Sequence, residues 1–530
     1  MATKLDPHHL VALMNYAFKD KQDGSPRRLD PSLHTFEGGI VDNQETNIRT
    51  FPILDALAHI SVSQEKHQVI AIGLQLNSRK QEIRLTVAEN KKVTDGLVNH
   101  LILVWRKLQA LSCEYGRNRN RGGRWDKSQP RSPEMPKEVG LPLKKEIFRD
   151  ICKYSLEKQM KRIDKWSEGL GRFVKELFKL RVSLDLRGFE LSLSKAVFAL
   201  LLAVRVVSKL RDNPKDQLTE SEWELVYFQS ILANKHVRIV LVDRNEFGCE
   251  ILAQELGIMV AYSTSQSVGT VYWGRSCIWV FRDYHLSEDP FPLRRALEKL
   301  TSLPRHIETL FGFAHSPRLQ SALRYRLFIS AVPEKTHTVK LPASPEEWES
   351  FLEVACRKRY DFPKTRAVEL AKTFGSKKWV CPVHCECGLI IYLQTRQGNQ
   401  WDHVPPFSYI GVSKISCSAC RIWMEAFNER SARKFYTRGS HGKWYWPWGV
   451  PIAEGPLVGL MAQKVLDKYL DLAVQKLLRS GSESSGASSA GAEHGLSDDH
   501  EKDAEAVGAA IAQGHGGSIL GFLNAMYPDA

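Results

Sequence analysis

A short carboxyl-terminal region holds half of the cysteines of this 530-residue chain, and this clustering limits what the chain can fold into more than any other feature. His384 and Glu386 stand two residues apart in this region, and Cys417 and Cys420 follow further along the chain. Imidazole nitrogen and thiolate sulfur are the ligands that a soft divalent ion such as zinc prefers. Ten cysteines in 530 residues are too few for a disulfide scaffold, so the pattern predicts a metal site.

One histidine and two cysteines supply three ligands, which leaves the fourth position open for water, as in a catalytic zinc site. We expect His384, Cys417 and Cys420 to hold Zn²⁺. Glu386 is then free to take a proton from that water and pass it to a departing amine. The pattern H-x-E followed by C-x-x-C is that of zinc-dependent base deaminases, and it predicts hydrolytic deamination of an amino-substituted ring carbon.

The apolar residues around these motifs predict the elements that carry them. Residues 388–393 favour a buried helix with His384 and Glu386 in its first turn. Residues 407–412 favour a core strand, and residues 417–427 favour a second helix. Cysteines three apart in a first helical turn project to the same side, where the helix amino terminus stabilises thiolates.

Four motifs together resemble a known family; they lie at residues 383–386, 409–414, 416–420 and 437–448. They are similar to those of the OTT-type deaminase-like family, in its fungal branch, within the nucleic acid/nucleotide deaminase superfamily. The resemblance covers about residues 366–450. It implies a cytidine-deaminase-like domain of three α/β/α layers with a zinc hydrolase site. Cys385 and Ser416 stand where the superfamily usually has Ala and Pro, and neither is a ligand in that pattern.

Other interpretations remain open at this point. A closed site of four ligands, for example Cys381, His384 or Cys385, Cys417 and Cys420, would only stabilise the fold. The cysteines could also be reduced core residues without a metal. The main alternative to an enzyme is a catalytically inactive deaminase fold that serves as an interaction module with a structural zinc. A toxin role like that of related bacterial deaminases rests on analogy with the family alone.

An aromatic block after the second cysteine pair supplies candidates for substrate binding. Bases could stack on Trp444 and Trp446 beside His441, while Arg438 meets phosphate. Packing in the core is the more common use of such aromatic residues.

Composition favours a globular protein with an anionic partner. The formal net charge of +14 is compatible with a nucleotide or nucleic acid substrate, although a solvated basic surface would explain it equally well. The amino terminus lacks the apolar core of a secretory signal, and the longest apolar run, residues 196–207, is too short to span a bilayer. We therefore expect no membrane partner and an intracellular location, in the cytoplasm or the nucleus.

The predicted fold class is α/β (α+β) with several domains, in which a mixed, helix-rich amino-terminal region precedes the deaminase-like domain. Residues 69–76 and 82–87 should form a hairpin, and residues 237–242, 258–262 and 270–281 should form strands. Helices are expected at residues 97–111, 143–181, 191–207 and 344–357. The expected organisation is an α+β unit at 1–116, a basic linker at 117–145, a helix-rich mixed region at 146–343, the zinc domain at 344–456, a helix at 457–478 and a disordered tail at 479–530.

Overall fold

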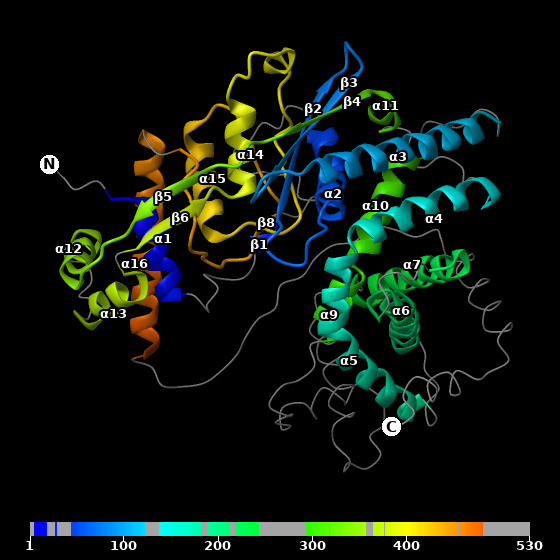
Figure 1. The fold of residues 1–530 in the computed structure, drawn as a ribbon, viewed down its shortest axis with the longest axis horizontal. Helices are drawn as coiled ribbons and strands as arrows, with labels where there is room; N and C mark the ends of the chain where they lie inside the picture. The colour runs from blue at the N-terminus through cyan, green and yellow to red at the C-terminus, as the bar shows by residue number, and fades with distance from the viewer. Residues whose placement is uncertain are drawn as a thin grey trace. The chain divides into compact units, whose positions relative to one another are not determined.

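The computed structural model assigns the described residues to two compact units (Figure 1). The first unit combines residues up to Lys158 with residues from His306 onward, and the second comprises residues 159–305. The described residues are 5–18, 27–28, 44–121, 137–181, 188–212, 218–242, 293–316, 319–356, 364–375, 377–452 and 455–480.

Four strands of the first unit form one sheet in the order β4-β3-β2-β7. β2 (Ile70–Asn77) and β3 (Glu82–Glu89) form the antiparallel hairpin that the sequence predicts. β4 (Arg326–Ala331) lies parallel to β3, and β7 (Gly411–Val412) lies antiparallel to β2. Most residues of β2 and β3 are buried, as expected for strands that are covered on both faces.

Two helices cover opposite faces of this sheet. A β-carbon added to Gly73 of β2 would lie 2.8 Å from a leucine side chain of α14 (Cys385–Gln394). The neighbouring residue Ile72 pairs with Gly411, whose added β-carbon would lie 2.3 Å from the backbone of α2 (Gln44–Ile60). Because successive residues of a strand point to opposite faces, α2 and α14 lie on either side of the sheet. The predicted three-layer α/β/α architecture is confirmed.

Helices from both ends of the chain pack beside these layers. α1 (Pro7–Phe18) and α15 (Ser418–Arg430) both contact α16 (Pro456–Ser480), which matches the helix expected at 457–478 (Figure 1). α3 (Asp95–Arg121) packs against α4 (Lys137–Tyr154). One hydrophobic core joins residues of α1, α14, α15 and α16.

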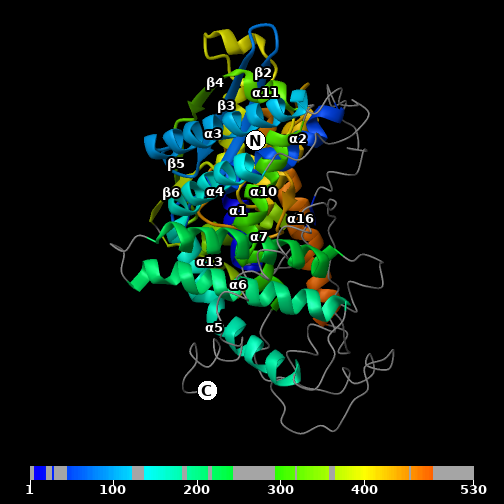
Figure 2. The same ribbon diagram turned by 90° about the vertical axis from the view of Figure 1, so that its right-hand side faces the viewer.

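The second unit is helical in its described part. α6 (Gly188–Asp212) and α7 (Glu220–Val242) lie side by side (Figure 1 and Figure 2). α5 (Leu156–Arg181) and α9 (Leu293–Leu300) contribute to the same core. Among the described residues of both units, no helix is long and apolar enough to cross a membrane.

The remaining described elements include α12 (Pro345–Cys356). The helix start predicted at Ser344 is confirmed, because the Ser344 hydroxyl accepts from Glu347 N (3.2 Å). The Glu347 carboxylate accepts from Ala343 N (2.6 Å), one residue before the cap. These elements are α10 (Ser302–His315), α11 (Gln320–Arg324), α12 (Pro345–Cys356), α13 (Lys364–Phe374), the 3₁₀ helix η2 (Gln400–His403), and the strand pairs β1 (Arg27–Arg28) with β8 (Gly439–Ser440) and β5 (Thr336–Lys340) with β6 (Lys378–Pro382).

The expected linker at 117–145 is wrong at both ends, since α3 continues to Arg121 and α4 begins at Lys137. Arginine and lysine have high helix propensity and leave their charges in solvent, so a packed helix extends through them. The single helix expected at 143–181 is broken at Ser155, between α4 and α5. The apolar stripe of α4 packs on α3, whereas that of α5 packs in the second unit.

The strand expected at 237–242 is wrong, because these residues form the end of α7. Ala233 and Val237 are buried in the helical core, and this packing outweighs the small helix penalty of β-branched residues. Of the strand expected at 407–412, only β7 is formed. The strands expected at 258–262 and 270–281, and the tail from residue 481, lie outside the described residues.

The division into units differs from the predicted boundaries. The sheet beneath α14 takes β2 and β3 from the region expected as a separate amino-terminal unit, and it takes β4 from the region before residue 344. The domain that holds the predicted site is therefore assembled from distant segments of the chain.

Candidate metal centre

His384 occupies the amino-terminal cap of α14, and only Val383 separates it from the end of β6. Its carbonyl accepts a hydrogen bond from Gly388 N (2.9 Å), which closes the first turn. The side chain of Asn90, the residue after β3, accepts a hydrogen bond from Cys385 N (2.9 Å). The hairpin thus fixes the start of this helix. Glu386 lies in the first turn as predicted, and His384 is the cap residue just before it.

Cys417 occupies the corresponding position in the second helix, as the cap of α15. Its sulfur accepts a hydrogen bond from Cys420 N (3.5 Å), so one thiol caps the helix that carries the other. Ser418 N donates to the carbonyl of Lys443 (3.0 Å), which holds the following loop against this turn.

The two helix starts bring the three predicted ligands together. Nδ1 of His384 lies 3.6 Å from Sγ of Cys417 and 3.3 Å from Sγ of Cys420. In a tetrahedral zinc site, bond lengths of about 2.3 Å to sulfur and about 2.0 Å to nitrogen put these donors about 3.6 Å apart. The potential ligand atoms of the three residues all lie within 4.8 Å of one another. The donor set and its spacing therefore fit zinc.

Burial and charge set the protonation of this group. Burial raises the pKa of the Cys417 and Cys420 thiols well above the ordinary value. For His384, burial acts to lower the pKa, but the nearby Cys417 and Glu386 outweigh it and the pKa is raised. Without a metal the two thiols hold their protons at neutral pH, so metal binding must displace these protons.

Glu386 lies beside the group without belonging to it. The side chain is 5% exposed, and its Oε2 accepts a hydrogen bond from the Cys385 thiol (3.4 Å). In the described part of the chain, the only group that could hold a metal consists of His384, Cys417 and Cys420. The carboxylate is therefore available for proton transfer.

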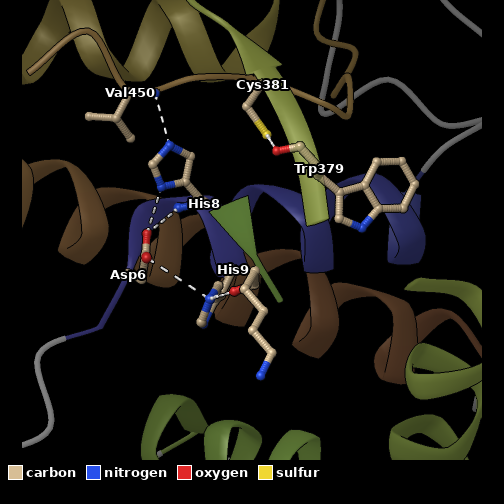
Figure 3. Close-up of polar contacts among 7 residues, drawn as sticks. Asp6, His8, His9, Trp379, Cys381 and Val450 are labelled. Atoms are coloured by element: carbon tan, nitrogen blue, oxygen red, sulfur yellow. Dashed lines mark hydrogen bonds and ion pairs between the residues drawn. The ribbon is translucent and has the colours of Figure 1, made fainter. Parts of the chain in front are cut away.

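A closed four-ligand site with Cys381 or Cys385 is not assembled in the described residues. Cys381 is fully buried in β6, and its thiol points to the carbonyl of Trp379 (3.9 Å), as Figure 3 shows. Cys385 contacts Glu386 instead of the metal group. The open three-ligand arrangement is the one that the geometry supports.

Trp448 contacts one of the three potential metal ligands through a hydrogen bond. Its indole Nε1 donates a hydrogen bond to Sγ of Cys420 (3.3 Å), and the side chain is fully buried. The chain is fixed just beyond it, because Val450 N donates to Nε2 of His8 (3.1 Å) (Figure 3). Nδ1 of His8 consequently carries the proton and donates to Asp6 Oδ1 (2.9 Å). Sequence reasoning missed this link to the amino terminus, since the contact spans nearly the whole chain.

The four substrate-binding candidates lie in different surroundings. Trp444 is buried, and Trp446 packs against Trp379 at a ring separation of 5.9 Å, which favours core packing for both. Arg438 is in electrostatic contact with the buried carboxylate of Asp55. His441 is partly exposed, and its Nδ1 accepts a hydrogen bond from Lys443 N (3.1 Å). A substrate role for these residues stays a prediction.

The exposed member of the aromatic block is Tyr445, which is 47% exposed. The Tyr445 ring contacts the His441 ring edge-on, with ring centroids 5.3 Å apart. The Tyr445 hydroxyl also interacts electrostatically with Cys417. It is better placed than Trp444 or Trp446 to meet a ligand at the centre. The sequence contains no signal that separates one aromatic residue of this block from the next by exposure.

Comparison with known proteins agrees with this geometry. The model of the OTT_1508-like deaminase family matches residues 383–452, a segment that contains all three potential ligands and Glu386. No curated protein and no solved structure matches the chain. The match does not address the fungal branch of the family. Over residues 383–452, the chain is therefore similar to the OTT_1508-like deaminase family.

Proposed function

We propose that this protein is a zinc-dependent hydrolytic deaminase that acts on a nucleobase in a nucleotide or nucleic acid. The observation that carries the proposal is the meeting of His384, Cys417 and Cys420 beside the buried carboxylate of Glu386. A site that only stabilised the fold would have no use for this carboxylate. The net charge of +14 favours a phosphorylated or polymeric substrate.

Each residue of the centre has a distinct role in this reaction. His384, Cys417 and Cys420 would hold the zinc ion, which supplies a Lewis acid that makes water a stronger nucleophile near neutral pH. Glu386 takes the proton from the attacking water and delivers it to the departing amine. The Cys385 thiol donates to Oε2 of Glu386 and helps to orient this carboxylate. Asn90 is a positioning residue, because it fixes the first turn of α14 through Cys385 N.

The test is ammonia release by the zinc-loaded protein from cytidine, adenosine, their monophosphates, and single-stranded DNA and RNA. Glu386→Gln should keep its zinc and lose activity by about a hundredfold or more. Glu425→Gln is the matched control, since Glu425 is an exposed glutamate on α15. Zinc binding with unchanged activity in Glu386→Gln would exclude Glu386 as the proton carrier, and the absence of ammonia from every substrate would favour the inactive interaction module.

A location in the cytoplasm or nucleus fits this substrate class and stays a prediction. Fluorescence microscopy of the tagged full-length chain tests it. Accumulation in a secretory compartment would contradict it.

A further inference from the structure

A polar pocket lies at the carboxyl-terminal end of α14, away from the metal ligands. Its volume is about 330 Å³, and its lining includes Gln75, Arg84, Tyr392, Arg396, Trp401 and Arg433. A helix of ten residues is about 15 Å long, so the pocket is well separated from the metal ligands at the start of α14. None of the lining residues belongs to the metal group.

The pocket contains a buried arginine that forms no ion pair with a carboxylate of the described residues. Arg84 of β3 is 4% exposed. Its guanidinium donates to Ser330 Oγ (2.8 Å), Gln75 Oε1 (3.4 Å) and Tyr392 OH (3.3 Å), and it lies 5.8 Å from the Tyr392 ring and 5.9 Å from the Trp401 ring. All of these partners in the described part of the chain are uncharged. Burial of a cation without a counter-charge is unfavourable, which indicates that an anion completes the site.

The residues around Arg84 are held in place by their own hydrogen bonds. Gln75 is 4% exposed, and its Nε2 donates to the carbonyls of Trp401 (3.1 Å) and Val404 (2.6 Å). Because Gln75 Oε1 also accepts from Arg84, one side chain joins the guanidinium to the wall of the pocket. The cationic group is therefore fixed before any ligand binds.

The charge of the pocket is positive. Arg396 is exposed at the rim, and Arg433 donates to the carbonyl of Pro406 (3.0 Å). The one carboxylate in the lining, Asp402, accepts hydrogen bonds from Gln397 N (2.9 Å) and Gly398 N (2.8 Å). Both carboxylate oxygens of Asp402 therefore face backbone N–H groups of its own loop and not the guanidinium of Arg84.

We propose that this pocket binds the phosphate group of a small phosphorylated ligand. A guanidinium offers a planar set of donors that matches phosphate oxygens, and further arginines at the rim can balance the second negative charge. A volume of about 330 Å³ lies at the lower end of the range for ligand pockets, which suits a nucleotide or free phosphate. The proposal is independent of the deaminase function, since it involves no residue of the metal centre.

Equilibrium binding of three probes tests the proposal: inorganic phosphate, a nucleoside monophosphate and the matching nucleoside. The full-length protein should bind the first two, with an affinity that falls as salt is added, and should bind the nucleoside much more weakly. Tighter binding of the monophosphate than of phosphate identifies a nucleotide as the ligand, and equal binding identifies free phosphate. No phosphate binding, or equal binding of nucleoside and monophosphate, overturns the proposal.

Variants locate the binding in this pocket. Arg84→Gln should weaken phosphate binding by about tenfold to a hundredfold, and Arg396→Gln by about twofold to fivefold. Arg324→Gln is the control, because Arg324 is exposed and lies outside the lining. Thermal unfolding and metal content show whether Arg84→Gln remains folded. Should it unfold, Arg396→Gln and Arg433→Gln decide the question, and unchanged phosphate affinity in both overturns the proposal.

Discussion

The indole Nε1 of Trp448 donates a hydrogen bond to Sγ of Cys420 at a distance of 3.3 Å, and both side chains are fully buried. Hydrogen bonds to a ligand sulfur stabilise the thiolate and orient it toward the metal. Trp448→Phe keeps an aromatic ring but removes this donor, so zinc affinity should fall by about tenfold. Competition with a chromophoric chelator measures the change.

Trp446→Phe is the matched control for this variant. Nε1 of Trp446 has no hydrogen-bond partner among the described residues, so its loss should leave zinc affinity nearly unchanged. Equal zinc affinity in the two variants would show that the bond from Trp448 does not support the metal.

The metal content of two cysteine variants distinguishes the open site from a closed one. Cys417→Ser removes a proposed ligand, and the purified protein should lose its zinc. Cys381→Ser should retain one zinc per chain, because the Cys381 thiol faces the carbonyl of Trp379. Elemental analysis of the purified proteins provides the measurement, and loss of zinc from Cys381→Ser would make Cys381 a ligand.

The candidate site was predictable because its chemistry is local in the sequence. Cys417 and Cys420 are three residues apart at the start of one helix, so their spacing indicates a common direction. His384 and Glu386 are two residues apart, and this spacing places both at the start of another helix. Apart from the β2–β3 hairpin, the pairing of the strands in the sheet that supports these residues was not predictable. β2 and β7 pair Ile72 with Gly411, and no local pattern specifies a partner so far along the chain.

Local propensity also failed where packing decides the structure. The β-branched end of α7 is helical because Val237 is buried against neighbouring helices, and propensity differences between helix and strand are smaller than this burial. Arg438 shows the same limit for function. Its sequence position suggests a phosphate contact, but its charge interacts with Asp55, which accepts from Tyr409 OH (2.7 Å) and Val412 N (2.8 Å).

The contact of β7 with α2 predicts the effect of a single added methyl group. A β-carbon at Gly411 would lie 2.3 Å from the carbonyl carbon of Leu54, and backbone cannot move aside as a side chain can. Gly411→Ala should lower the free energy of unfolding by about 1–3 kcal/mol. Gly459→Ala in α16 is the control; nothing lies within 4 Å of its added β-carbon, so stability should rise by up to about 1 kcal/mol. Urea unfolding measures both, and equal stability of the variants would contradict the close approach.

A buried histidine between α3 and α4 predicts how stability depends on pH. His100 stacks on Tyr154 with ring centroids 3.7 Å apart, and burial lowers its pKa from 6.5 to about 4 although Asp150 and the Ile60 carbonyl act to raise it. The unfolded chain binds a proton near pH 6.5 and the folded chain does so only near pH 4, so stability is complete above pH 6.5 and falls between these values by about 3 kcal/mol. His100→Phe should lose this part of the pH dependence in urea unfolding at pH 7.5, 6 and 5. His67→Asn, at an exposed site, should keep the wild-type profile. If all three proteins show the same pH profile, the His100 ring is already protonated in the folded state.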